Sequence, residues 1–74
     1  MTPRALIRAS SSRLEKVGVP DPSVDASALL AHLTGRPALE LRLDADTELD
    51  SSILEAYEAL LQRREDREPL EDLL

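Results

Sequence analysis

The chain has 74 residues, 42% of them apolar, with no cysteine and a formal net charge of −6. This length allows one small domain, and the sequence excludes a disulfide framework, a thiolate metal site and a membrane-spanning helix, which needs about 20 apolar residues in a row. Because affinity for nucleic acids depends on basic groups at the phosphates and on stacking rings, an acidic chain with one aromatic residue is not expected to bind RNA or DNA directly.

The first predicted helix begins at Pro3, with Thr2 as its cap, and is closed by Gly18. Its expected core face consists of Leu6, Ser10, Leu14 and Val17. Residues 1–18 carry four basic groups and one acidic group, whereas residues 19–74 carry five basic and fourteen acidic groups. No apolar stretch at the start is long enough for a signal peptide, so we expect a cytoplasmic protein.

A second helix is predicted from Pro22 to Thr34, after a proline-rich linker. Asp21 is expected to cap it, and Gly35 to end it. Its core face is expected to consist of Ala26, Leu29, Leu30 and Leu33.

Leucines alternate with other residues between Pro37 and Leu43, a pattern that by itself favours a strand. No second strand candidate exists to satisfy the backbone of a first one. We therefore predict one or two helical turns from Pro37, followed by an acidic loop over residues 44–48.

The longest predicted helix runs from Ser51 to Arg64, with Asp50 as its cap. Its apolar face consists of Ile53, Leu54, Tyr57, Leu60 and Leu61. A proline then opens a final apolar turn that ends on two leucines, and this ending indicates a piece of a longer polypeptide. The sequence as a whole predicts a single domain over residues 1–74, an all-α bundle of four to five short, mostly antiparallel helices.

No catalytic, cofactor-binding or metal-binding residue is predicted. His32 could act as a base, but it has no ligand type three or four residues away, and a packing or capping role is favoured. Acidic residues at positions 44, 46, 48 and 50 are spaced as in a calcium-binding loop. The central glycine of such a loop is missing, so a calcium site is not predicted.

Two adjacent arginines, Arg63 and Arg64, are the candidate partner contacts. One interpretation is that they complement the negative end of the helix dipole. The other is that they bind a carboxylate or a backbone group of a partner protein or domain, which arginine is well suited to do. The first interpretation is favoured.

Small, acidic, aromatic-poor helical chains include the acyl carrier proteins, whose modified serine follows an aspartate at the start of a helix. Ser51 and Ser52 after Asp50 resemble that motif in part. Only 22 residues follow Ser52, however, which is too few for the rest of a carrier fold. A carrier domain therefore stays the alternative, and a helical protein-interaction module is the third possibility.

Three segments together resemble one family. They read Asp25-Ala26-Ser27-Ala28-Leu29-Leu30-Ala31-His32-Leu33-Thr34-Gly35, then Leu60-Leu61-Gln62-Arg63-Arg64, then Arg67-Glu68-Pro69-Leu70. In this order and spacing they are similar to the N-terminal domain of the peptide-chain release factor glutamine methyltransferases, also called the HemK or PrmC family. The chain departs from the family pattern at three places. Ser27 occupies a position where the family usually has glutamate, and Arg67 one where glycine is common. Glu71-Asp72 replaces the usual Gln-Tyr.

The resemblance implies that the parent enzyme transfers a methyl group from S-adenosylmethionine to the glutamine of the Gly-Gly-Gln motif in class 1 release factors. It also implies that the cofactor and catalytic residues lie after residue 74, in a Rossmann-like domain, and that this chain holds none. Its expected partners are the release factor and its own catalytic domain. Its expected task is to recognise the release factor and to position it.

Overall fold

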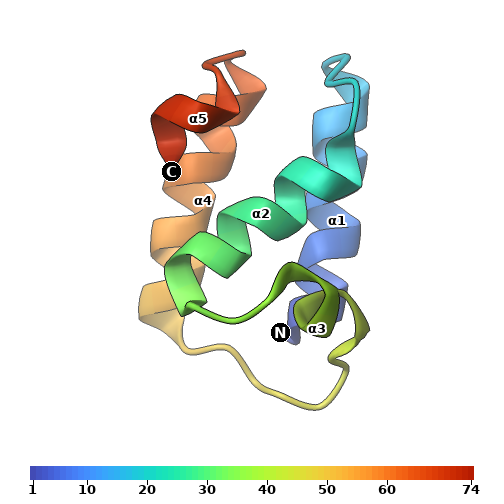
Figure 1. Ribbon diagram of the computed structural model, residues 1–74, viewed down its shortest axis with the longest axis vertical. Helices are drawn as coiled ribbons and strands as arrows, with labels where there is room; N and C mark the ends of the chain where they lie inside the picture. Colours follow the sequence, from blue (N-terminus) through green and yellow to red (C-terminus); the bar gives the residue numbers. More distant parts are fainter.

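The computed structural model describes all 74 residues and contains five helices and no strand. In chain order they are α1 (Pro3–Lys16), α2 (Pro22–Thr34), α3 (Ala38–Leu43), α4 (Ser51–Glu65) and α5 (Leu70–Leu73). Helices α1 and α4 stand on either side, and α2 runs back obliquely between them (Figure 1). The short helix α3 lies at the lower end, and α5 folds back along the upper part of α4. The predicted all-α bundle is confirmed.

Side chains cap the two long outer helices as predicted. The Thr2 hydroxyl accepts a hydrogen bond from the Ala5 N–H at 3.3 Å, and the Asp50 carboxylate accepts one from the Ile53 N–H at 2.9 Å. Each bond satisfies a backbone donor that the first helical turn leaves free. The expected cap of α2 is wrong in detail, because Asp21 stands at the capping position but its side chain makes no capping bond.

Three residues have a positive φ angle, which places them in the left-handed region. Gly18 (82°) follows the end of α1 and Gly35 (72°) ends α2, so both glycines are the helix stops that the sequence predicts. The third is Arg67 (69°), just after α4. A side chain in this region is strained, which explains why a glycine suits that position.

The buried face of α1 shares Ser10 and Leu14 with the predicted one, and the predicted Leu6 is only partly buried against the core. Ile7 is buried, and together with Pro3, Ser10 and Leu14 it forms a face with alternating spacings of four and three residues. Val17 was placed on that face but is 40% exposed, because the helix ends at Lys16 and Val17 is already its C-terminal cap.

Helix α2 is the central element of the core. Ala26, Leu29 and Leu30 are completely buried, and the only aromatic side chain, Tyr57 of α4, packs against them. The Tyr57 hydroxyl donates a hydrogen bond to the Ala26 carbonyl at 2.9 Å. Burial raises the pKa of Tyr57 to about 12, so this hydroxyl stays a donor at ordinary pH.

The segment with alternating leucines is helical, as predicted. Leu41 is fully buried, whereas Leu39 and Leu43 are 70% and 72% exposed. A helix turns by about 100° per residue, so Leu39 and Leu43 share one side and Leu41 lies on the other. At the C-terminus Leu73 is buried, and α5 therefore packs onto α4.

Candidate functional site

A buried ion pair joins the start of α2 to the end of α4. The Arg64 Nε donates to Asp25 Oδ2 at 2.9 Å, and the two side chains are only 12% and 11% exposed. The Arg64 guanidinium also donates to the Glu68 carbonyl at 3.0 Å. One side chain thus binds both a carboxylate and a backbone group, and both belong to its own domain. The pair also links two of the segments that carry the family resemblance.

The neighbouring arginine has a different environment. Arg63 is half exposed and makes two hydrogen bonds, each 2.9 Å long, to the two carboxylate oxygens of Glu68. These bonds lower the pKa of Glu68 below its usual 4.5. The structure thus places the two predicted partner-contact residues side by side, with Arg63 at the surface and Arg64 inside.

A third arginine binds the turn that follows α4 to the end of α1. Arg67 donates a hydrogen bond to the Val17 carbonyl at 3.0 Å, and so binds the C-terminal end of α1. Its backbone is held in the left-handed conformation by the turn after α4. We call residues 66–69 the connector, because they join α4 to α5. Arg64 and Arg67 hold this connector against α2 and α1, and Arg63 of α4 binds its Glu68 side chain.

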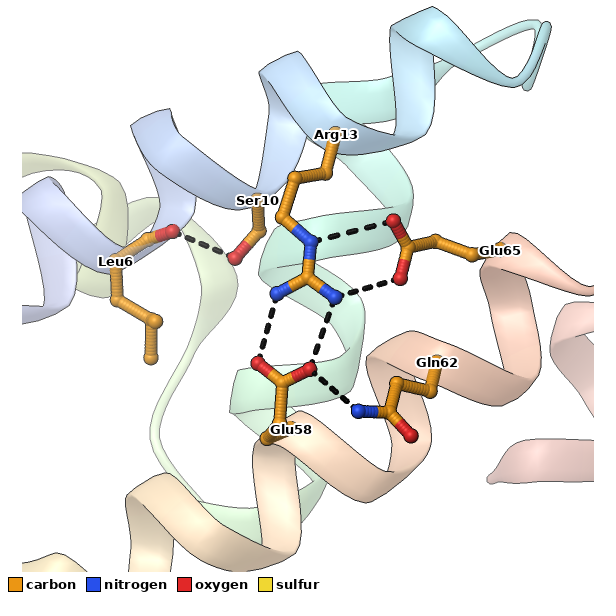
Figure 2. Close-up of polar contacts among 6 residues, drawn as sticks. All are labelled: Leu6, Ser10, Arg13, Glu58, Gln62 and Glu65. Carbon is orange, nitrogen blue, oxygen red and sulfur yellow. Dashed lines mark hydrogen bonds and ion pairs between the residues drawn. The ribbon is translucent and has the colours of Figure 1, made fainter.

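A further arginine joins the two outer helices below the connector. Arg13 of α1 lies between Glu58 and Glu65 of α4 and binds both carboxylates (Figure 2). Its bonds to Glu58 are 2.7 and 2.8 Å, and those to Glu65 are 2.6 and 3.2 Å. The hydrogen bonds from Arg13 lower the pKa of Glu58, and the two carboxylates raise the pKa of Arg13. Sequence reasoning missed this cluster. The spacing of seven residues between the two glutamates, which puts them on one side of α4, is the signal for it.

The other residues weighed from the sequence do not converge on one site. His32 is exposed in the last turn of α2, so a packing role is wrong, and its place at the helix end is the one that the sequence predicts. Ser51 and Ser52 are exposed in the first turn of α4, where the Ser52 hydroxyl donates to the capping carboxylate of Asp50 at 2.6 Å.

The acidic loop after α3 is held by internal bonds to Asp44. Its Oδ2 atom accepts a 2.8 Å bond from Arg36, and its Oδ1 atom accepts bonds from the Asp46 and Thr47 N–H groups, both 2.9 Å. Bonds from Thr47, Asp46 and Arg36 hold the pKa of Asp44 well below its usual 3.8. No group of three or more His, Cys, Asp or Glu residues is placed to hold a metal ion. No pocket opens on the bundle, and none of its helices is long and apolar enough to cross a bilayer.

These contacts define an all-helical module whose charged side chains join its outer helices, hold the loop after α3 and bind the connector to the bundle. A family model described as the PrmC N-terminal domain matches residues 5–74, and the chain belongs to this family. No solved structure matches.

Several curated relatives are methyltransferases. The chain is 32% identical over its full 74 residues to the release factor glutamine methyltransferase of Vibrio cholerae, of which it covers 26%. It is 35% identical over 68 residues (92% of the chain) to the release factor glutamine methyltransferase of Corynebacterium glutamicum, of which it covers 23%. It is 31% identical over 67 residues (90% of the chain) to the bifunctional methyltransferase of Rickettsia typhi, of which it covers 13%. The chain thus spans about a quarter or less of the length of these relatives.

Proposed function

We propose that this chain is the substrate-recognition domain of an S-adenosylmethionine-dependent protein-(glutamine-N5) methyltransferase. In this proposal the catalytic domain follows residue 74 and holds the cofactor, and the whole enzyme acts in the cytoplasm. Its substrate is a class 1 release factor, methylated on the glutamine of the Gly-Gly-Gln motif. Membership of the PrmC N-terminal domain family supports the proposal, and so do the release factor glutamine methyltransferases among its relatives.

The observation that carries the positioning role is the fixed connector. An amide nitrogen is a weak nucleophile, so the target glutamine has to be held accurately against the methyl donor. Contacts remote from the reacting atoms can supply the binding energy for this placement, but only if they are held rigidly relative to the active site. The buried Asp25–Arg64 pair and the Arg67 bond to Val17 hold the connector, and with it the start of α5, against the bundle.

The two candidate partner contacts take different roles in this proposal. Arg63 is half exposed, and its guanidinium can exchange Glu68 for a carboxylate of the partner at little cost, because exposed ion pairs contribute only about 0–1 kcal/mol. Arg64 is engaged inside the domain, so its contribution is to hold the connector.

Deletion tests the proposal. The full-length enzyme and a variant lacking residues 1–74 are compared for methylation of a purified class 1 release factor and for binding of S-adenosylmethionine. We expect the deletion to raise the KM for the release factor at least tenfold and to leave the affinity for S-adenosylmethionine within twofold. An unchanged KM, or a loss confined to cofactor binding, would refute a recognition role.

A further inference from the structure

The exposed face of α3 has no apolar partner within the domain. Leu39 and Leu43 lie one turn apart on the same side of the helix and are 70% and 72% exposed. They are the two most exposed large apolar side chains in the chain. Leu41 holds the opposite side of α3 in the core. Single exposed leucines are common, but a matched pair on an otherwise anchored helix indicates a surface that another molecule covers.

A basic side chain flanks this pair on α3 itself. Arg42 is exposed and lies three residues after Leu39, which places it beside the leucines on the helix surface. It forms no ion pair, and its guanidinium donates only one 3.3 Å bond, to the Ser23 hydroxyl.

A second basic residue lies at the end of α3. The Arg4 N–H donates to the Asp44 carbonyl at 3.0 Å, so the start of α1 adjoins the residue that follows Leu43. Arg4 is exposed and forms no ion pair. We call Arg4, Leu39, Arg42 and Leu43 the α3 patch.

The two basic residues of the patch bind no carboxylate, and neither do Arg8, Lys16 and Arg67 elsewhere in the chain. Fifteen acidic side chains are present, and the arginines that bind carboxylates are Arg13, Arg36, Arg63 and Arg64. Arg4 and Arg42 are left without a carboxylate, although the chain as a whole is acidic. Glu40 also lies on α3, but Arg36 binds its carboxylate. The α3 patch therefore combines two exposed leucines with the unpaired charges of Arg4 and Arg42, and a segment that carries leucine-like and acidic side chains is complementary to it.

We propose that the α3 patch is the docking surface for an acidic, partly apolar segment of the protein substrate. This inference rests on the proposed function and adds to it the surface that is used. The position of the patch argues against the downstream domain as the occupant. Arg4 lies in the first turn of α1, and the connector binds Val17 at the other end, roughly 20 Å away along a helix of this length. The C-terminus lies beside α4, on the other side of the bundle from α3 (Figure 1).

The test uses the full-length enzyme and a class 1 release factor as the probe. The variant L39Q/L43Q removes the apolar pair and keeps helix propensity, since glutamine and leucine are similar helix formers. The matched control is V24Q, which changes a 52% exposed apolar residue of α2 that has no role in the proposal. A second variant, R4Q/R42Q, removes the charges alone. The Kd for the release factor, its dependence on salt, the Kd for S-adenosylmethionine and the unfolding midpoint are measured for each.

We expect L39Q/L43Q to weaken release-factor binding about tenfold or more and V24Q to weaken it less than twofold. Neither variant should change cofactor binding or the unfolding midpoint. R4Q/R42Q should weaken binding at low salt and flatten its salt dependence. Release-factor affinity within twofold of wild type in both double variants overturns the inference. So does a change of oligomeric state or of domain arrangement without a change in that affinity, since the patch would then bind a second copy or the downstream domain. If deletion of residues 1–74 weakens release-factor binding and the patch variants do not, the α3 patch is not the docking surface, but the recognition role of the domain is supported.

Discussion

The adjacent arginines at the end of α4 allow a matched comparison of a buried and an exposed ion pair. Arg64→Gln leaves Asp25, which is 11% exposed, without its cationic partner, and such a loss costs about 3–5 kcal/mol when the pair is fully buried. Because a little exposure remains, we expect a loss of about 3 kcal/mol in the free energy of unfolding. Arg63→Gln removes a half-exposed pair, and its expected cost is about 0–1 kcal/mol.

These costs are large relative to the whole domain. A chain of 74 residues has a free energy of unfolding of about 4–11 kcal/mol at typical values per residue. The loss at Arg64 therefore removes a major share of the stability, whereas the loss at Arg63 is close to the error of measurement.

Urea unfolding of the 74-residue chain, followed by the helical circular dichroism signal, measures both variants. Asp25→Ala, alone and combined with Arg64→Gln, completes a double-mutant cycle, and we expect a coupling energy above about 1 kcal/mol. If Arg64→Gln and Arg63→Gln differ by less than 1 kcal/mol, or if the coupling is near zero, then the pair does not hold the connector and the argument from rigidity fails.

Three further outcomes are expected from urea unfolding. The Arg67→Gly variant should be more stable than Arg67→Ala by about 1 kcal/mol. Both variants lose the arginine side chain, but only glycine is unstrained at this positive φ. Equal stabilities would show that the strain is absent. Tyr57→Phe should cost about 1–2 kcal/mol with helix content unchanged, because the Ala26 carbonyl loses its buried donor; a cost below the error would contradict this. Asp44 has a pKa lowered by folding, so its contribution is present above its usual 3.8 and is lost as the pH falls below it. Acidification below pH 4 should therefore destabilise wild type more than Asp44→Asn, as unfolding at pH 3 and pH 7 would show.

Local signals were enough to predict most of the secondary structure. The prolines at the helix starts, the caps Thr2 and Asp50 and the glycines at 18 and 35 act within a few residues, and the structure confirms them. Val17 was misplaced because helical spacing alone does not show that α1 has already ended.

The long-range contacts could not be predicted in the same way. Arg13 contacts Glu58 and Glu65 across about 50 residues of sequence, and Arg64 contacts Asp25 across 39, so the pairs exist only once the helices have packed. The resemblance located both partners of the second pair, but it did not show that they touch. The short helix α3 was predicted, and yet nothing in the alternation of its leucines showed which of them would face solvent.

The single ring of Tyr57 has a practical consequence for spectroscopy. With no tryptophan or phenylalanine in the chain, near-ultraviolet absorption and emission of the domain arise from this one phenol. Its hydroxyl remains un-ionised over the whole range of ordinary buffers, because its pKa is raised to about 12. A tryptophan added to the release factor or to the catalytic domain would therefore be detected with little emission from this domain. Energy transfer from Tyr57 to that tryptophan would report its distance from the centre of the bundle.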